Sequence, residues 1–264
     1  MQKLTARPIL NDKGAGNFEN GDEILLIASD STTHDSKKYA IGEKAYFEDF
    51  KLPKGTSNAN FSAMYPYPTE QIYSLTDYST NRSYTDPNFD LLLASPVNVS
   101  TTETSHKKLV FRHAMHKLVI NYTSDDTYSE EELVEIITTM NPVEVVAHID
   151  LTKGEVTHAS GNEPMEAKGK TISFVLPPQS IEHDMDYDYD YYGDKYKSLF
   201  IRIGDKSHRF SFGGRKIDGK DLTHFEGGKI LTINIEVKRD EVRLNSFTIS
   251  EWGNQGTINE SINM

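Results

Sequence analysis

Cysteine is absent from this sequence. Its absence excludes a disulfide framework, a thiolate nucleophile and a zinc site built on cysteine. A long apolar run is also missing, since no segment approaches the roughly 20 residues that a membrane-spanning helix requires. The opening MQKLTARPIL lacks the apolar core of a secretory signal. We therefore expect either a cytosolic protein or a mature form whose export signal has been removed.

Basic residues are scarce as well. The chain has 28 Lys and Arg against 40 Asp and Glu, which gives a formal net charge of -12. A surface of this sign repels the phosphate backbone of nucleic acids. We therefore expect no nucleic-acid partner.

Aromatic residues are plentiful, with 14 Tyr and 12 Phe set among Val, Ile and Thr, and this composition favours strands. Residues 22–29, DEILLIAS, form a short apolar run between turn residues, which predicts a buried strand. Similar runs follow at short intervals, separated by Gly, Asp or Lys turns. No alternation of strand and helix occurs, which makes a parallel α/β fold improbable. The spacing predicts an all-β fold of antiparallel sandwiches.

Two stretches depart from this strand pattern. Tyrosine-rich residues 69–88 carry no period and predict an irregular connection. Residues 128–140, YSEEELVEIITTM, begin with a capping box at Ser129 and Glu132. The apolar residues that would share one helical face are Leu133, Ile136, Ile137 and Met140. The sequence EIITT would equally serve as a strand, so both structures remain open for this stretch.

Residues 109–122, LVFRHAMHKLVINY, place His113 and His116 three positions apart in an apolar run. In a strand, positions i and i+3 point to opposite faces, so these two histidines could not bind one metal ion. The apolar alternation changes phase between Met115 and His116, which predicts a β-bulge or a bend. We expect a half-buried His113 whose ring is hydrogen-bonded to a neighbour, with a shared zinc ion as the alternative. The histidines that form no ligand spacing are His106, His148, His158, His183, His208 and His224.

Residues 182–194, EHDMDYDYDYYGD, contain a second candidate site. Four acidic residues alternate along this stretch, Asp184, Asp186, Asp188 and Asp190, and Tyr187, Tyr189 and Tyr191 would face the other side of a strand. Four carboxylates on one strand face could bind calcium, and the tyrosines could stack on a sugar. The EF-hand order is not met, because with Asp186 as position 1 the Gly at position 6 is replaced by Tyr191. The other interpretation is a solvated, mutually repelling segment that discourages sheet pairing.

Catalytic patterns have little support. The sequence has no G-x-S-x-G elbow, and GGRKIDGKD at 213–221 lacks the order of a phosphate-binding loop. A glycosidase would need two carboxylates brought together by the fold, which a sequence alone does not exclude. We expect the single Trp, Trp252, to anchor the last strand. The predictions are no catalytic residue, no metal site, no cofactor and no enzymatic activity.

Several separated segments occur in a characteristic order: GDEILLIAS, FSAMYPYP, DLLLAS, LVFRHAMHKLVINY, SFVLPPQ, FEGGKILTINIEV and SFTISEWGNQG. Each motif is short, but the ordered set is specific, above all the F-x-H segment followed by I-x-x-W near the end. With these motifs the chain resembles the fimbrillin family, the pilin-like proteins of type V pili in Bacteroides and its relatives. The resemblance covers about residues 18 to 256.

The resemblance implies two transthyretin-like antiparallel β-sandwich domains in tandem. We place them at residues 1–104 and 105–264, with the boundary in the polar linker TTETSHKK. It also implies export as a lipoprotein precursor and display on the cell surface, at the outer membrane, in a fimbrium. The expected partners are other fimbrial subunits, joined by strand exchange, and host or bacterial surface ligands. Strand exchange is β-augmentation, in which one chain adds a strand to the open sheet of another.

Two features depart from the family pattern, and the tail fits it imperfectly. The chain has no lipobox cysteine, and its candidate cleavage residue, Arg7, precedes Pro8, which makes a poor bond for trypsin-like proteases. The tail TINESINM repeats Ile258 and Ile262 at four residues rather than two, which makes an imperfect donor strand. We expect a structural fimbrial subunit or adhesin, whose role as stalk, tip or anchor stays open. The alternative is a non-polymerising surface module that binds carbohydrate or calcium.

Overall fold

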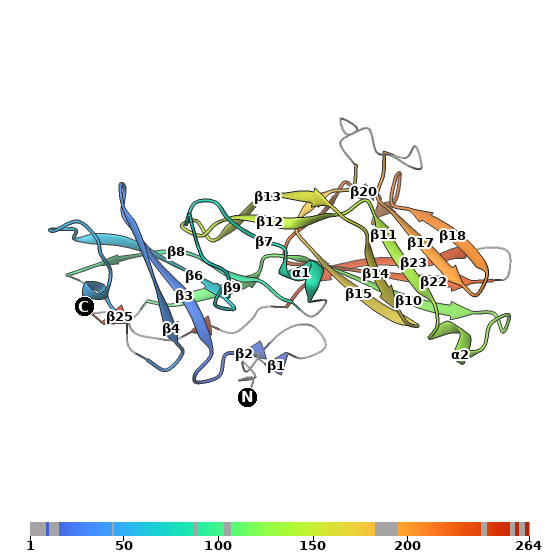
Figure 1. Cartoon of the computed structure of the whole chain (residues 1–264), viewed down its shortest axis with the longest axis horizontal. Coiled ribbons are helices and arrows are strands. Elements are labelled where there is room, and N and C mark those ends of the chain that lie inside the picture. Colours follow the sequence, from blue (N-terminus) through green and yellow to red (C-terminus); the bar gives the residue numbers. More distant parts are fainter. Residues whose placement is uncertain are drawn as a thin grey trace.

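The computed structural model describes residues 9–10, 16–43, 45–86, 89–102, 107–182, 195–238, 242–253, 257–258 and 262–263. The molecule is all-β and elongated. A six-stranded sheet lies at one end, two four-stranded sheets lie at the other, and a three-stranded sheet lies between them (Figure 1). Within the described residues, no helix has the length and apolar character needed to cross a membrane.

The six-stranded sheet is antiparallel throughout. Its strands, in order across the sheet, are β24 (Thr257–Ile258), β9 (Leu109–His113), β8 (Leu92–Ser100), β6 (Asn58–Tyr65), β3 (Glu23–Ser29) and β4 (His34–Ala40). The buried strand predicted at residues 22–29 is confirmed as β3. Its continuous apolar run suits a strand covered on both faces. Leu26 belongs to an apolar cluster on one face, and Ile27 belongs to a second cluster.

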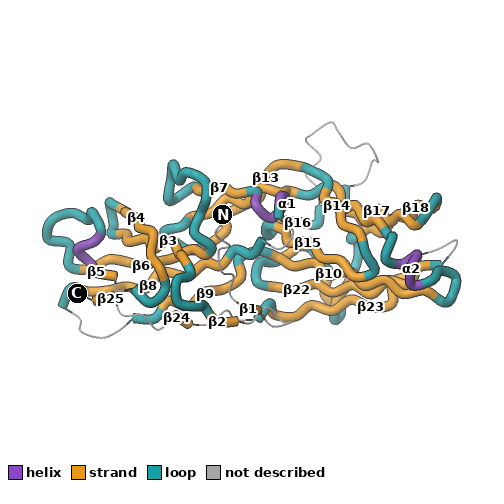
Figure 2. The backbone as a smooth tube through the Cα atoms, turned by 60° about the horizontal axis from the view of Figure 1, so that its bottom comes forward, coloured by secondary structure: helices purple, strands orange, loops and turns teal. Residues whose placement is uncertain are grey.

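Two four-stranded sheets pack face to face at the other end of the molecule. The first contains β15 (Thr171–Leu176), β10 (His116–Ser124), β22 (Lys229–Val237) and β23 (Val242–Glu251), and its strands run along the long axis (Figure 2). The second contains β14 (Met165–Lys168), β11 (Ile137–Asn141), β17 (Ser198–Ile203) and β18 (Lys206–Ser211). One apolar cluster fills the space between them, with Leu118 and Ile233 from the first sheet and Met140 and Ile201 from the second.

One central pair differs from the predicted antiparallel order. β10 and β22 are parallel, with pairs from Lys117–Ile230 to Ser124–Val237. Parallel neighbours need a long crossover rather than a hairpin. Here the chain between them forms all four strands of the facing sheet, and it also forms β15 of their own sheet and two strands of the three-stranded sheet.

The three-stranded sheet joins segments that are distant in the sequence. It contains β13 (Glu155–Asn162), β12 (Glu144–Asp150) and β7 (Tyr78–Thr80). The prediction of an irregular connection over residues 69–88 is wrong in this part, because β7 pairs with β12 and is followed by the helix α1 (Arg82–Thr85). The pairing partner lies some 70 residues away, so no local period could show it.

The stretch 128–140 contains both of the structures that the sequence left open. The helix α2 (Glu130–Leu133) comes first, and β11 follows it. The Ser129 hydroxyl accepts a hydrogen bond from the Glu132 amide (3.3 Å), and the Glu132 carboxylate accepts one from the Ser129 amide (2.8 Å). The predicted capping box is therefore confirmed, and pairing of β11 with β14 and β17 ends the helix after one turn.

The remaining elements are short. They are the strand pairs β1 (Ile9–Leu10) with β2 (Gly16–Asn17), β16 (Gln179–Ser180) with β21 (His224–Phe225), β19 (Lys216–Ile217) with β20 (Lys220–Asp221) and β5 (Ala45–Tyr46) with β25 (Ile262–Asn263), and the 3₁₀ helix η1 (Phe47–Asp49). The GGRKIDGKD stretch forms the β19–β20 hairpin, whose turn residues Asp218 and Gly219 both have positive φ angles. A two-residue Asp-Gly turn is a preferred hairpin connection.

Candidate functional site

Residues 109–124 change from one sheet to another. β9 belongs to the six-stranded sheet and β10 to the first four-stranded sheet, with a bend at Met115 between them. The predicted change of apolar phase is confirmed as this bend. On both sides alternate residues are buried, so each half of the segment shows one face to a core.

His113 lies at the end of β9 and is more buried than the sequence predicted. Its exposed fraction is 4%, so the prediction of a half-buried ring is wrong, whereas the predicted hydrogen bond is present. The His113 Nδ1 lies 2.9 Å from the Asp90 carboxylate. The ring stacks on Trp252, with centroids 4.2 Å apart and planes 6° from parallel. His113 therefore links the start of β8 to the end of β23.

His116 lies at the start of β10 and has different neighbours. Its Nδ1 donates to the Glu226 carbonyl at 2.9 Å, and its ring lies 5.0 Å from the Phe225 ring. Its exposed fraction is 1%. This burial lowers the pKa of His116 to about 4, so the ring is neutral at physiological pH. The structure does not bring the two histidines together around one position.

Trp252 follows β23 directly and is buried, as expected for an anchor of the last strand. Its backbone amide donates to the Gly228 carbonyl (2.8 Å), and the Gly228 amide donates to the Met115 carbonyl (2.8 Å). A side chain at the preceding Gly227 would place its Cβ 2.6 Å from the Ala114 carbonyl oxygen. Gly227 and Gly228 of the FEGGK motif thus let the turn before β22 lie against the bend between β9 and β10.

The C-terminal segment covers the outer edge of β9. β24 pairs antiparallel with β9, with Thr257 opposite Val110 and Ile258 opposite Leu109. Further along the chain, β25 pairs in parallel with β5. The tail that the sequence predicts as an imperfect donor strand therefore makes two short pairings within its own chain. Without β24, one side of β9 would present unpaired backbone groups.

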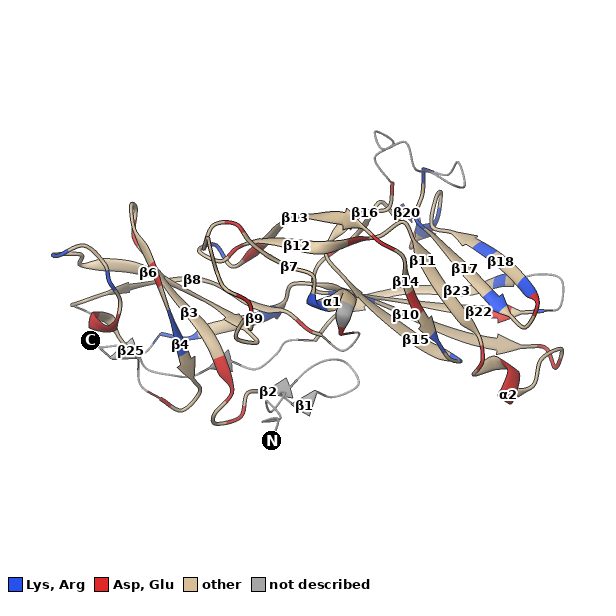
Figure 3. Cartoon of the chain, viewed as in Figure 1, with Lys and Arg blue, Asp and Glu red and all other residues tan. Residues whose placement is uncertain are grey.

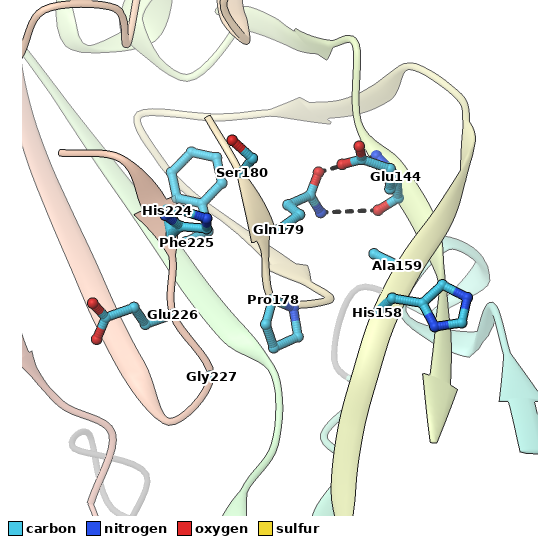
Figure 4. A pocket seen from close by; sticks show the side chains of 10 residues that line it. All are labelled: Glu144, His158, Ala159, Pro178, Gln179, Ser180, His224, Phe225, Glu226 and Gly227. Carbon is cyan, nitrogen blue, oxygen red and sulfur yellow. Dashed lines mark hydrogen bonds between the residues drawn. The ribbon is translucent and has the colours of Figure 1, made fainter. Parts of the chain in front are cut away.

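A cleft of about 610 Å³ lies beside the bend between β9 and β10, where Gly227 is one of its lining residues (Figure 4). Its lining residues are Glu144, His158, Ala159, Pro178, Gln179, Ser180, His224, Phe225, Glu226 and Gly227. The Gln179 side chain accepts from the Glu144 amide (3.0 Å) and donates to the Glu144 carbonyl (2.9 Å). The Glu144 carboxylate pairs with Lys197 at 2.8 Å, and burial lowers the pKa of Lys197. These groups hold β12 against β16, which explains why glutamine ends the SFVLPPQ motif.

Two further histidines form a pair that the sequence did not predict. His148 and His158 lie opposite each other on β12 and β13, with ring centroids 4.1 Å apart. The His148 ring also contacts Asp77 (3.3 Å) and Ser160 (2.8 Å). Strand register creates this pair, and register is not readable from spacing alone. In the part of the chain that the structure describes, no group of three or more His, Asp or Glu residues could hold a metal ion.

Several predicted features lie outside the described residues. They are the acidic segment from Asp184 to Asp190 with its tyrosines, the Arg7–Pro8 bond, His106 and His183. The linker TTETSHKK is described only at residues 101–102 and 107–108.

Comparison with known proteins gives a consistent set of matches. A family model described as fimbrillin-like matches residues 12–252. A candidate cell adhesion protein from Bacteroides uniformis aligns with a TM-score of 0.67 and 17% identity, over 92% of this chain and 95% of that one. A second candidate cell adhesion protein, from Bacteroides ovatus, gives 0.58 and 14%, over 89% and 88%.

The tip fimbrial protein Mfa3 from Porphyromonas gingivalis, with a C-terminal truncation, gives a TM-score of 0.52 and 11% identity, over 89% of this chain and 95% of that one. At such identities these three structures show a shared fold. No curated protein matches the sequence.

We predict that replacing Trp252 by alanine lowers the free energy of unfolding by about 3 to 5 kcal/mol, because a large buried aromatic residue leaves a cavity. The matched control is Tyr73→Ala, since Tyr73 is 88% exposed and its loss should change stability by about 0.5 kcal/mol or less. Urea unfolding followed by circular dichroism measures both, because the variant lacks the only tryptophan. Equal stability of the two variants would contradict the anchoring role.

We predict that His116 makes stability depend on pH. Its pKa is about 4 in the folded chain and about 6.5 when unfolded, so its contribution is complete above pH 6.5 and is lost as the pH falls toward 4. Between pH 7.5 and pH 5 the expected loss is about 2 kcal/mol. His116→Gln keeps a donor for the Glu226 carbonyl but does not titrate. Urea unfolding at both pH values should give a smaller loss for His116→Gln, and equal losses would show this assignment to be wrong.

Proposed function

The chain belongs to the fimbrillin-like family, and from this membership we propose that it is a structural fimbrial subunit or adhesin displayed on the cell surface. Fimbrillin-like proteins are structural rather than enzymatic, so the prediction that the chain is not an enzyme is confirmed by its family. The proposed location is the fimbrium at the outer membrane, reached by export as a lipoprotein precursor. The proposed partners are other fimbrial subunits and ligands on host or bacterial surfaces.

We propose that the fold consists of two transthyretin-like β-sandwich domains, divided at residues 104/105. Support comes from two large apolar clusters, one against the six-stranded sheet and one between the two four-stranded sheets. β9 follows the proposed division in sequence but pairs with β8, so a strand of the second part completes a sheet of the first. A third cluster, which includes Met64, Ile149 and Trp252, packs residues from both parts together.

We propose that subunits assemble by strand donation and that β9 provides the accepting edge. The observation that carries this proposal is the pairing of β24 with β9. It supports the idea that this edge accepts an antiparallel strand through main-chain hydrogen bonds. The donor is a short terminal segment, so the same pairing can form within one chain or between two chains, as in domain swapping.

The proposal predicts that a synthetic peptide of residues 254–264 binds a chain shortened to end at Gly253. Circular dichroism first checks that the shortened chain keeps its β signal. Fluorescence anisotropy of the labelled peptide should then show saturable binding. A peptide with Thr257→Pro/Ile258→Pro should bind at least about tenfold more weakly, because proline cannot donate to the ladder with β9.

The matched control peptide carries Thr257→Val/Ile258→Val, which keeps both backbone donors and should bind like the native peptide. Absence of saturable binding, or equal binding of the proline peptide, would rule out β9 as the acceptor of this tail.

A further inference from the structure

The solvent side of the β14–β11–β17–β18 sheet carries basic and aromatic side chains in adjacent rows, together with one carboxylate, Glu166, opposite Thr139 on the β14 edge. Phe200 on β17 lies opposite Arg209 on β18 and Thr139 on β11. In the next row of the same face, Arg202 lies opposite Ser207 and Ile137. Directly paired residues share one side of a sheet. We call the surface formed by Ile137, Thr139, Phe200, Arg202, Ser207 and Arg209 the basic face.

Buried and exposed residues alternate along β17 and β18, and this alternation shows on which side of the sheet the basic face lies. Leu199, Ile201 and Phe210 are buried in the cluster between the two sheets. Arg202 and Arg209 are exposed, and Phe200 is half-buried. The basic face is therefore the outer surface of the sheet, where a large ligand can reach it.

Internal contacts hold the arginine beside the aromatic ring. The Arg209 guanidinium carbon lies 5.7 Å from the Phe200 ring centroid. Its Nε and Nη2 donate to the Ser198 hydroxyl at 3.4 and 3.3 Å. A guanidinium that is already oriented loses less conformational freedom when it binds a planar anionic group.

The charge of the basic face contrasts with the rest of the protein. Figure 3 shows Lys and Arg along β17 and β18, at the end of the molecule away from the six-stranded sheet. Lys206 is exposed at the start of β18, next to Asp205 in the turn. The whole chain has a formal net charge of -12. A basic surface on an acidic protein favours an anionic partner at that location and repels it elsewhere.

We propose that the basic face binds an anionic glycan, with carboxylate or sulfate groups on Arg202 and Arg209 and a sugar ring against Phe200. The planar guanidinium of arginine matches the geometry of such groups. The Ser207 hydroxyl can exchange hydrogen bonds with sugar hydroxyls, and the Thr139 hydroxyl, which donates to the Glu166 carboxylate at 3.4 Å, can accept one. A protein partner would need a larger apolar centre than Phe200 and Ile137 provide. The inference rests on the proposed adhesin function and names its ligand class.

Three polymers with one glucan backbone test the proposal: neutral dextran, carboxymethyl-dextran and dextran sulfate. Biolayer interferometry with the full chain should show binding of one or both charged polymers and no binding of dextran. Affinity should fall as NaCl rises from about 50 to 300 mM, because salt screens exposed charges. Arg202→Gln/Arg209→Gln should lower affinity at least tenfold. The two charged arms distinguish carboxylate from sulfate as the recognised group.

The matched control is Lys37→Gln/Lys38→Gln on β4, which removes the same charge from the six-stranded sheet. It should leave affinity within about twofold, and an equal loss in both double variants would overturn the proposal, as would absence of binding to both charged polymers. Phe200→Leu should weaken binding to the charged dextrans but not to polyvinyl sulfonate, which has no sugar. Without that difference, glycan recognition is wrong.

Sedimentation of Arg202→Gln/Arg209→Gln checks for a different occupant. Without polymer, the sedimenting mass of this variant is compared with that of the native chain. A difference in mass, with polymer binding unchanged, would show that the basic face contacts a second copy and would overturn the proposal. Binding of the 254–264 peptide uses β9 and should be unchanged when this variant is likewise shortened to end at Gly253. Failure of glycan binding is therefore distinguishable from failure of strand donation.

Discussion

The fold depends on one extended segment, residues 109–124, which contributes β9 to the six-stranded sheet and β10 to a four-stranded sheet. Its first half pairs with β8 and its second half pairs with β15 and β22, so the chain must bend between them. The bend brings backbone carbonyls close to a turn that only glycine fits, at Gly227. The stacked rings of His113 and Trp252, with Asp90 as hydrogen-bond partner, fill the space beside it. Because this segment continues from one sheet into the other, the two sheets lie toward opposite ends of the molecule, which is therefore elongated (Figure 1).

The local features of the fold were readable from the sequence, and the long-range ones were not. Alternating burial in β9 and β10, the buried run of β3 and the capping box at Ser129 all follow from residue order within a few positions. The parallel pairing of β10 with β22 and the pairing of β7 with β12 join segments far apart in sequence. No period within either strand determines its partner.

The candidate site shows the same division. The spacing of His113 and His116 predicted opposite faces, and their environments do differ. Burial of His113 depends on Trp252, which lies almost 140 residues later, and the sequence alone does not reveal that contact. The His148–His158 stack likewise arises from strand register. The hydrogen bonds between Gln179 and Glu144 join segments that meet only in the folded chain.

The two proposed interaction surfaces lie in different parts of the elongated molecule. The β9 edge belongs to the six-stranded sheet, and the basic face lies on β11, β17 and β18 at the other end (Figure 1). A subunit built in this way can be joined to a neighbour at one end while the other end stays accessible to a ligand. In the proposed assembly, backbone hydrogen bonds would give the first contact its strength, and charge would give the second its selectivity.

Disulfide trapping tests strand donation most directly, because the native chain has no cysteine. Val110→Cys and Thr257→Cys alter residues that lie opposite each other in the β9–β24 pair. Strand donation predicts that mixing and oxidising the two single variants gives more disulfide-linked dimer than either variant alone on a non-reducing gel. The double variant reports closure within one chain. Closure in the double variant, with no additional dimer in the mixture, would contradict donation between subunits.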